Sequence, residues 1–462
     1  MPPTPLLSVG QSRLGRYLLA LFLGYFVLLL ALITSKPLWL DEVIQLRITC
    51  AGGWHDLVHE VLRNAGGAPL GYLGQQWLIS LAGCSIWTAR ILSTLAGAGS
   101  LVLFVVFGTQ LGLRRSTVWL GAALWALCPL AVRYSLEGRP YMQALFFALV
   151  AVTCQVRFGN TGRIRWAVSL AVSLAAAIYS QPFAIFAPVG FSAWHAWSSR
   201  NVRYILLTGV AYALAGLSFV PWLLAANTQW HDSIAHSQGG FAWTPALAIL
   251  ILRECVGDGY PAAVPAILLA IIGAVTIARR PSRDPGPTLI AALLTSLLLC
   301  LLADAKFNYF FAIRQVIYMV PFLLLLAAEG AIVLWTDSRY RAPVAVLVAV
   351  FAVAAAAKDY RHLTDRQENW NQLAVHLSDA ARDGCILIPG PDGAGVLTFF
   401  RPEIANQVCD SGLSSPRIVV PLHPYIEAHA VRVAEDALLA HGMVRRSSEQ
   451  LGFARIEVFT KP

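Results

Sequence analysis

The sequence predicts an all-α polytopic membrane protein with about eleven membrane-spanning helices, followed by a small α/β domain. Of its 462 residues, 57% are hydrophobic and only 13% are charged, whereas about 25% of the residues in a soluble domain carry charge. Apolar runs long enough to cross a bilayer recur up to residue 357. After that point the chain returns to the composition of a soluble domain.

Arginines gather in alternate connections between these apolar runs, which fixes an expected topology. The expected spans are roughly 17–34, 91–109, 117–134, 141–156, 166–180, 182–197, 204–225, 261–278, 287–303, 316–335 and 342–357. The arginines are Arg13, Arg16, Arg114, Arg115, Arg157, Arg163, Arg165, Arg200, Arg203, Arg279, Arg280, Arg283, Arg339 and Arg341. Positive residues mark cytoplasmic connections, so this rim accounts for the net charge of +9. A nucleic acid partner is therefore not expected.

The first span has no cleavage signature and is expected to remain as an uncleaved anchor. A long outer loop, 36–89, follows it and carries Asp41 and Glu42 directly after the membrane. Residues 43–64 have helical spacing of apolar side chains. Leu70 to Trp87 is apolar enough to span, but a span there would place every later arginine cluster outside. We therefore expect an amphipathic helix in the outer interface.

The other outer connections also carry polar side chains, whereas the inner ones carry mainly arginine. Arg133, Glu137 and Arg139 are concentrated between the third and fourth spans. Lys306 and Arg314 lie in the connection 303–315. This distribution predicts that the chemistry is on the outer face, on a substrate with an anionic head and a long apolar tail.

The tail, residues 358–462, is expected to form a small α/β domain, outside by helix parity. Helices are expected at 368–381 and 425–439, and strands at 385–388, 417–420 and 454–459. Cysteines on the outer side either remain thiols or pair in an oxidising compartment, as Cys50 with Cys84 and as Cys385 with Cys409.

Five short motifs, taken in order, resemble the GT-C glycosyltransferases. They are Leu38-Trp39-Leu40-Asp41-Glu42; Ala68-Pro69-Leu70-Gly71-Tyr72 with Ala89-Arg90-Ile91-Leu92-Ser93; Leu136-Glu137-Gly138-Arg139-Pro140-Tyr141; Tyr179-Ser180-Gln181-Pro182; and Ile313-Arg314-Gln315 with Pro321. They are most similar to protein O-mannosyltransferases, the aminoarabinose transferases of lipid A and their bacterial relatives. The resemblance covers about the first 190 residues and the stretch near Arg314.

This resemblance implies a GT-C fold of about eleven to thirteen membrane helices in a bacterial inner membrane. It implies a catalytic domain at 1–357, including the first outer loop at 36–89, and a small extracytoplasmic domain at 358–462. The implied activity is transfer of a sugar from a polyprenyl-phosphate donor to an acceptor hydroxyl outside the cytoplasm. Membrane lipids surround the chain, and the acceptor is a glycan, a lipid or a protein.

Carried onto this sequence, the resemblance makes Asp41 the catalytic base, Glu42 its neighbour and Glu137 a second acid. A carboxylate can take the proton of an attacking hydroxyl, and direct displacement inverts the anomeric centre. Arginine can meet the departing phosphate with paired donors. Arg139 and Arg314 are the first candidates for that phosphate, and the others are Arg90 and Lys306. Further expected substrate contacts are Tyr141, Tyr179 and Gln181, the last standing where the family often has histidine.

Other interpretations of these residues stay open. Asp41 and Glu42 can cap the helix that follows them. Glu137 and Arg139 can neutralise each other at the membrane edge. Arg314 can be an interfacial residue whose charge reaches water. Asp41 and Glu137 either share a divalent cation or act without one. A transporter or flippase of a lipid-linked or anionic substrate is the alternative function, and a scaffold that displays the outer domain is a third.

Overall fold

The computed structural model confirms a mostly helical chain that ends in a small sheet. It describes residues 8–63, 67–236, 245–257, 259–280, 286–307, 313–366, 368–389, 393–409, 413–424, 426 and 428–462. The chain divides into two compact units. The first contains Met1–Ile33 and Gly52–His362, and the second contains Thr34–Ala51 and Leu363–Pro462.

The first unit is built from helices alone among its described residues. Its α-helices are α1 (Ser8–Leu32), α3 (Trp54–Arg63), α4 (Pro69–Ala82), α5 (Ile86–Gln110), α6 (Arg115–Ala126), α7 (Pro129–Ser135), α8 (Tyr141–Thr161), α9 (Ile164–Ser180), α10 (Phe186–Ser199), α11 (Val202–His236), α12 (Pro245–Gly257), α13 (Tyr260–Ala278), α14 (Pro287–Phe307), α15 (Val320–Trp335) and α16 (Arg341–Thr364). Short 3-10 helices are η1 (Pro182–Ile185), η2 (Ile313–Met319) and η3 (Ser338–Tyr340). Each of the eleven expected spans falls on one or two of these helices.

Seven helical segments of the described chain are long and apolar enough to cross a bilayer, and the count becomes eight if a bent pair forms one span. That pair is α6 and α7, which meet at 58°. Helix α9 and the apolar part of α14, Pro287–Ala303, are shorter. The bend is explained by Pro129, the first residue of α7, because proline cannot donate the backbone hydrogen bond that would continue α6.

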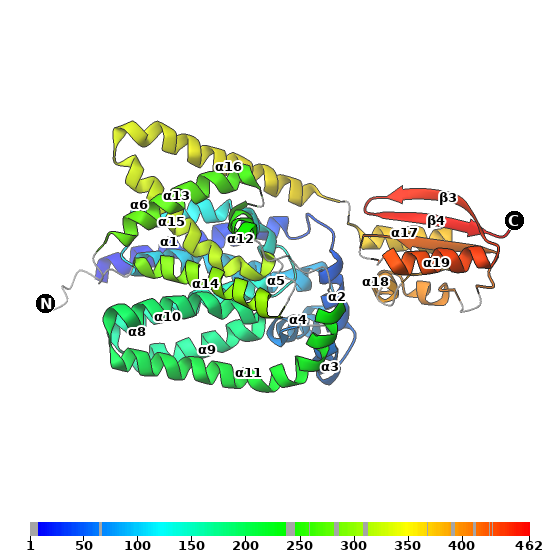
Figure 1. Cartoon of the computed structure of the whole chain (residues 1–462), viewed down its shortest axis with the longest axis horizontal. Helices are drawn as coiled ribbons and strands as arrows, with labels where there is room; N and C mark the ends of the chain where they lie inside the picture. Colours follow the sequence, from blue (N-terminus) through cyan, green and yellow to red (C-terminus); the bar gives the residue numbers. More distant parts are fainter. Residues whose placement is uncertain are drawn as a thin grey trace. The chain divides into compact units, whose positions relative to one another are not determined.

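The membrane helices pack closely where glycines face each other. A Cβ on Gly273 of α13 would lie on the Leu326 carbonyl oxygen of α15, and a Cβ on Gly330 of α15 would lie on the Leu269 carbonyl oxygen of α13. The two backbones can therefore meet because neither glycine has a side chain. Elsewhere α9 packs against α8 and α11, an arrangement visible in Figure 1.

The first outer loop contains three helices. Residues 43–64, expected as one helical stretch, are divided between α2 (Leu40–Cys50) and α3, because Gly52 and Gly53 interrupt the helix. The expected interfacial helix is α4, and it ends at Ala82, before α5 begins at Ile86. The Ser85 side chain caps α5 by accepting a hydrogen bond from the Thr88 backbone N–H. Exposed Trp77 and Leu81 suit an interfacial position.

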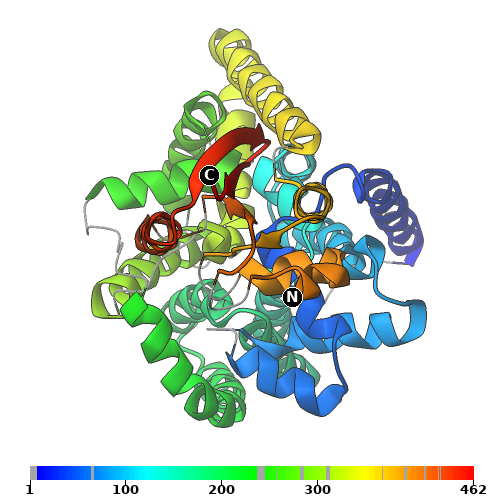
Figure 2. The same cartoon turned by 90° about the vertical axis from the view of Figure 1, so that its right-hand side faces the viewer.

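The second unit is a four-stranded sheet between two layers of helices, and its strands are orange and red in Figure 2. Its strands are β1 (Cys385–Ile386), β2 (Arg417–Leu422), β3 (Val444–Leu451) and β4 (Ala454–Thr460), in the order β1-β2-β4-β3. Only the β1–β2 pair is parallel. Its other helices are α17 (Trp370–Ala380), α18 (Gly393–Phe400), η4 (Pro402–Asn406) and α19 (Ala428–Ala440).

Alternation along β2 explains the two layers. Val419 joins a core with Trp370 and Leu373 of α17, whereas Ile418 and Val420 join a core with Leu438 of α19. The sequence predicted β1, β2 and β4 but not β3. Strand β3 is exposed and polar along most of its length, so it carries no apolar alternation that would have indicated a strand.

Helix α2 belongs to this second unit. Val43 is completely buried in the core around Trp370, and Leu40 and Ile44 pack against the same core. The expected division placed the whole loop 36–89 with the membrane part. In the structure, Thr34–Ala51 cluster with Leu363–Pro462, since the apolar face of α2 completes the core of the α/β unit.

Candidate active site

The turn between α7 and α8 carries Glu137 and Arg139, and it is fixed to α5 by close backbone packing. A Cβ on Gly138 would lie 2.7 Å from the Ala89 carbonyl oxygen. The Ser93 hydroxyl donates to the Arg139 carbonyl oxygen at 2.9 Å. The Thr94 hydroxyl donates to the Ser135 carbonyl oxygen, also at 2.9 Å. The backbone on both sides of Glu137 is therefore held to one helix.

The Glu137 carboxylate is buried next to two basic side chains. It is 2% exposed, and its Oε1 accepts a hydrogen bond from Arg133 Nε at 2.8 Å. His362, near the end of α16, brings Nε2 to 4.0 Å from the same oxygen. Burial of a charge is expensive unless it is paired, so Arg133 stabilises the ionised form of Glu137. The ion pair described for this acid is thus the one with Arg133.

Arg139 contacts two tyrosines. Its Nη1 donates to the Tyr72 hydroxyl at 3.4 Å, and its Cζ lies 5.8 Å from the centre of the Tyr141 ring. Tyr141 is 6% exposed and also meets the Tyr134 ring edge-on at 5.4 Å. The aromatic neighbours fix the direction of a planar cation that is itself only half-buried.

Arg90 lies in a different setting. It is 2% exposed, and its Nη1 donates to the Ile33 carbonyl oxygen at the end of α1 at 2.8 Å. That bond satisfies a carbonyl at a helix C-terminus. Arg90 therefore joins the first span to α5.

The residues expected in the turn after α9 pack against α11. The Tyr179 hydroxyl donates to the Ser218 carbonyl oxygen, and its ring lies 5.1 Å from the Phe219 ring. Gln181 ends α9 with its backbone N–H bonded to the Ala177 carbonyl oxygen. Tyr179 thus has a packing role that the motif did not indicate.

Lys306 and Arg314 are the two remaining residues expected to bind the phosphate. The backbone of Lys306 is part of α14 and that of Arg314 is part of η2. Their side chains are not among the described residues.

The acid pair Asp41–Glu42 lies at the start of α2, in the second unit, and its two members have different surroundings. Glu42 is 1% exposed, and its Oε2 accepts the Trp39 backbone N–H at 3.3 Å. Asp41 is half-buried. Glu368 also contributes to the start of this helix, since its Oε1 accepts the Leu40 backbone N–H at 2.7 Å and the Trp370 indole N–H at 3.0 Å. Capping by acids therefore takes place, through Glu42 and Glu368.

Sequence reasoning missed three of these contacts. Arg133 and Glu137 are four residues apart, a spacing at which helical side chains meet, so the sequence spacing could have indicated their contact. His362 and Glu368 follow the last span, and no pattern in the sequence indicates their contacts. Across the described residues, no group of three or more His, Cys, Asp or Glu side chains is arranged to hold a metal ion.

One family model matches part of the chain. Residues 56–234 match the family model described as dolichyl-phosphate-mannose-protein mannosyltransferase, which is less than half of the chain. No curated protein sequence matches significantly.

Solved structures share the fold at low sequence identity. ArnT from Cupriavidus metallidurans bound to undecaprenyl phosphate has a TM-score of 0.60 at 12% identity, covering 96% of this chain and 97% of that one. The archaeal oligosaccharyltransferase AglB from Archaeoglobus fulgidus, in complex with an inhibitory peptide and a dolichol-phosphate, has a TM-score of 0.56 at 11% identity, covering 87% and 69%. This chain therefore shares the fold of the ArnT and AglB structures, and its residues 56–234 match a mannosyltransferase family model.

Proposed function

We propose that this protein transfers a sugar from a polyprenyl-phosphate donor to an acceptor hydroxyl at the outer face of the bacterial inner membrane. The observation that carries the proposal is the GT-C fold over almost the whole chain, shared with an ArnT structure that holds undecaprenyl phosphate. The AglB structure holds dolichol-phosphate and a peptide, which supports a lipid-linked donor. The acceptor is a glycan, a lipid or a protein.

The reaction is a direct displacement with Asp41 as base. The acceptor hydroxyl oxygen forms a bond to the anomeric carbon while the bond from that carbon to the phosphate oxygen breaks. The bonding electrons leave with the polyprenyl phosphate, and the hydroxyl proton passes to the Asp41 carboxylate. Attack on the face opposite the phosphate inverts the anomeric centre. A positioned base of this kind contributes about 10²- to 10⁴-fold to the rate.

The surroundings of the two acids at the start of α2 support this division of roles. Glu42 is buried and accepts the Trp39 backbone N–H at the start of its own helix, so its carboxylate caps that helix. Asp41 is half-buried and is the acid of the pair that can approach a substrate. Glu137, paired with Arg133 at 2.8 Å, then acts as an acid that positions the Arg133 guanidinium beside the α7–α8 turn.

Arg139 is the proposed phosphate ligand in that turn. Its guanidinium is directed by Tyr72 and Tyr141, and a cation held in place stabilises charge that develops on a leaving phosphate. Arg314 and Lys306 complete the proposed phosphate contacts, as their sequence positions suggest.

Two observations support the outer location. The arginine-rich connections lie at the opposite ends of the helices from the Glu137 turn, as the chain order of the spans requires, and positive connections are cytoplasmic. Cys385 and Cys409 form a disulfide with an S–S distance of 2.04 Å. Disulfides persist in oxidising compartments such as the periplasm.

Replacement of the base tests the proposal. We expect Asp41→Asn to reduce sugar transfer from a polyprenyl-phosphate donor by at least about 100-fold, because amide nitrogen cannot take the proton. The assay follows radiolabelled sugar from donor to acceptor in membranes, with equal protein amounts. The control is Asp56→Asn on α3, an exposed acid, which should keep wild-type turnover.

Wild-type turnover by Asp41→Asn would exclude Asp41 as the base. A wild-type protein that moved the lipid-linked donor across a bilayer without transferring its sugar would instead favour a flippase.

A further inference from the structure

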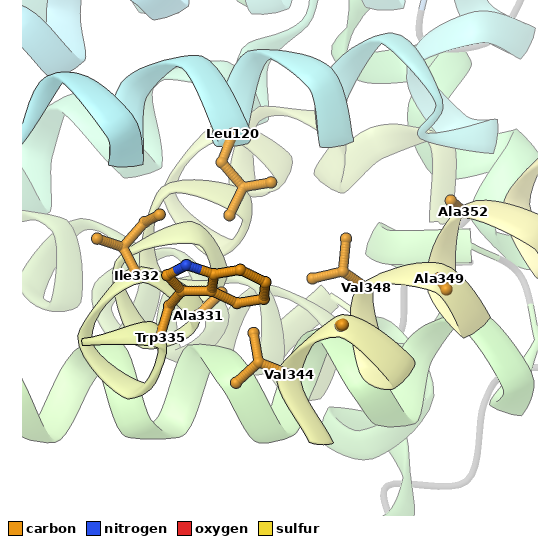
Figure 3. A pocket seen from close by; sticks show the side chains of 9 residues that line it. Leu120, Ala331, Ile332, Trp335, Val344, Val348, Ala349 and Ala352 are labelled. Atoms are coloured by element: carbon orange, nitrogen blue, oxygen red, sulfur yellow. The ribbon is translucent and has the colours of Figure 1, made fainter. Parts of the chain in front are cut away.

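An apolar groove of about 450 Å³ lies among α6, α15 and α16, at the end of the unit where α15 turns into α16. Every residue that lines it is aliphatic or tryptophan. Figure 3 shows Leu120, Trp335 and Val348, one from each helix, directed toward the same space. The volume is within the range of ligand sites in proteins, roughly 300–1,000 Å³.

Helix α16 leaves this space open because of its sequence. It meets the rest of the unit through Val344, Phe351 and Ala355, which are buried. Ala345 and Ala349 line the groove and are still exposed, so small side chains leave room beside the buried stripe. The walls belong to the candidate spans Val316–Trp335 and Ser338–Thr364. The groove therefore opens toward the hydrocarbon of the bilayer rather than toward water.

The mouth of the groove carries positive charge. Arg339 and Asp337 pair with each other, Nη2 to Oδ2 at 2.9 Å. Arg341, at the start of α16, donates from Nε to the Trp335 carbonyl oxygen at 3.2 Å. Two arginines and one aspartate give this connection a net charge of +1, next to Trp335, a residue type that favours the headgroup level.

The groove is separate from the candidate active site. His362, which lies 4.0 Å from Glu137, is 17 residues beyond Ala345 along α16. At 1.5 Å per residue these two positions on the helix are about 25 Å apart. The cation at Arg341 therefore faces the leaflet opposite to the one at which Glu137 lies.

We propose that this groove binds one acyl chain of an anionic phospholipid, with the lipid phosphate at Arg341. The chain supplies apolar contacts that α16 lacks, since most of its surface faces away from the rest of the unit. The lipid thereby holds α16 against α15 and α6. Basic side chains at a membrane surface attract anionic lipids, which favours a phospholipid with a negative headgroup over a neutral one.

Native mass spectrometry of the full-length protein tests this site. Delipidated protein receives phosphatidylglycerol, phosphatidylcholine or undecaprenyl phosphate at equal concentrations. We expect one retained phosphatidylglycerol, bound at least about tenfold more strongly than phosphatidylcholine. Ala349→Phe, which fills the groove, should lower that binding at least tenfold. Val346→Phe is the matched control, because Val346 lies on the same helix and is 60% exposed. This variant should bind phosphatidylglycerol as the wild type does.

The headgroup contact has its own variant, which leaves the helix packing alone. Arg341 is exposed, and Arg341→Gln should abolish the preference for phosphatidylglycerol over phosphatidylcholine. Equal phosphatidylglycerol binding by Ala349→Phe and Val346→Phe would overturn the groove assignment. Stronger retention of undecaprenyl phosphate, lost in Ala349→Phe, would overturn the phospholipid assignment.

Discussion

Glu368 is the residue through which the C-terminal unit holds the helix that carries Asp41. Its Oε1 accepts the Leu40 backbone N–H at 2.7 Å and the Trp370 indole N–H at 3.0 Å. Glu368→Ala removes both acceptors at once. We expect the start of α2 to open locally much more often, with Asp41 no longer held in one position.

The expected size follows from the two bonds. A hydrogen bond to a charged group contributes about 1.5–3 kcal/mol. Because this site is only partly buried, the lower part of that range applies, and water recovers some of the loss. The total is therefore about 2–3 kcal/mol, equivalent to about a 30- to 150-fold rise in local opening at 1.4 kcal/mol per factor of ten. Glu368→Gln, which keeps an acceptor oxygen, should show a smaller effect.

Hydrogen exchange measured by mass spectrometry on the full-length protein detects this opening. Peptides over residues 38–44 should lose protection in Glu368→Ala by the stated factor, whereas peptides in α5 should not change. Asp379→Asn is the control, because Asp379 is exposed and pairs only with Arg382 at 2.7 Å in the described contacts. Unchanged exchange at 38–44 in Glu368→Ala would refute the view that Glu368 anchors α2.

Two further predictions concern the α7–α8 turn and the sheet unit. Gly138→Ala should destabilise the protein by about 1–3 kcal/mol, because the new Cβ would lie 2.7 Å from the Ala89 carbonyl oxygen. The loss should appear as a lower melting temperature in detergent. Gly209 has open space around it, so Gly209→Ala should not lower the melting temperature. Burial lowers the pKa of His423 to about 4, so stability of the second unit should be full above pH 6.5 and fall as pH drops toward 4, since only the unfolded chain binds the proton in that window. His423→Gln should flatten this part of the pH dependence of protection in β2, and an identical slope in both proteins would contradict it.

Much of the helical part could be predicted from the sequence because its signals are local. Apolar length marked each expected span, and arginine placement separated α4 from the expected spans. Pro129 at the start of α7 likewise marks the bend after α6. These features depend on a few neighbouring residues, so a single sequence is enough to read them.

The partners of α2 could not be predicted in this way. Leu40 and Glu368, which share a hydrogen bond, are 328 residues apart. The apolar residues on one face of a helix do not indicate which core that face packs against. The same limit applies to His362, whose position 4.0 Å from Glu137 depends on the course of α16. The expected domain boundary differed from the structural one for this reason.

The acid pair shows how helix geometry separates two residues that the sequence treats alike. Consecutive side chains on an α-helix point about 100° apart. Because Val43 and Ile44 face the core, the two acids before them point in different directions, and only one of them can reach the backbone N–H groups at the helix start. Glu42 takes that position, at 1% exposure, and its carboxylate accepts the Trp39 N–H. Asp41 is half-buried on the same turn, so two acids that are adjacent in the sequence differ in their surroundings.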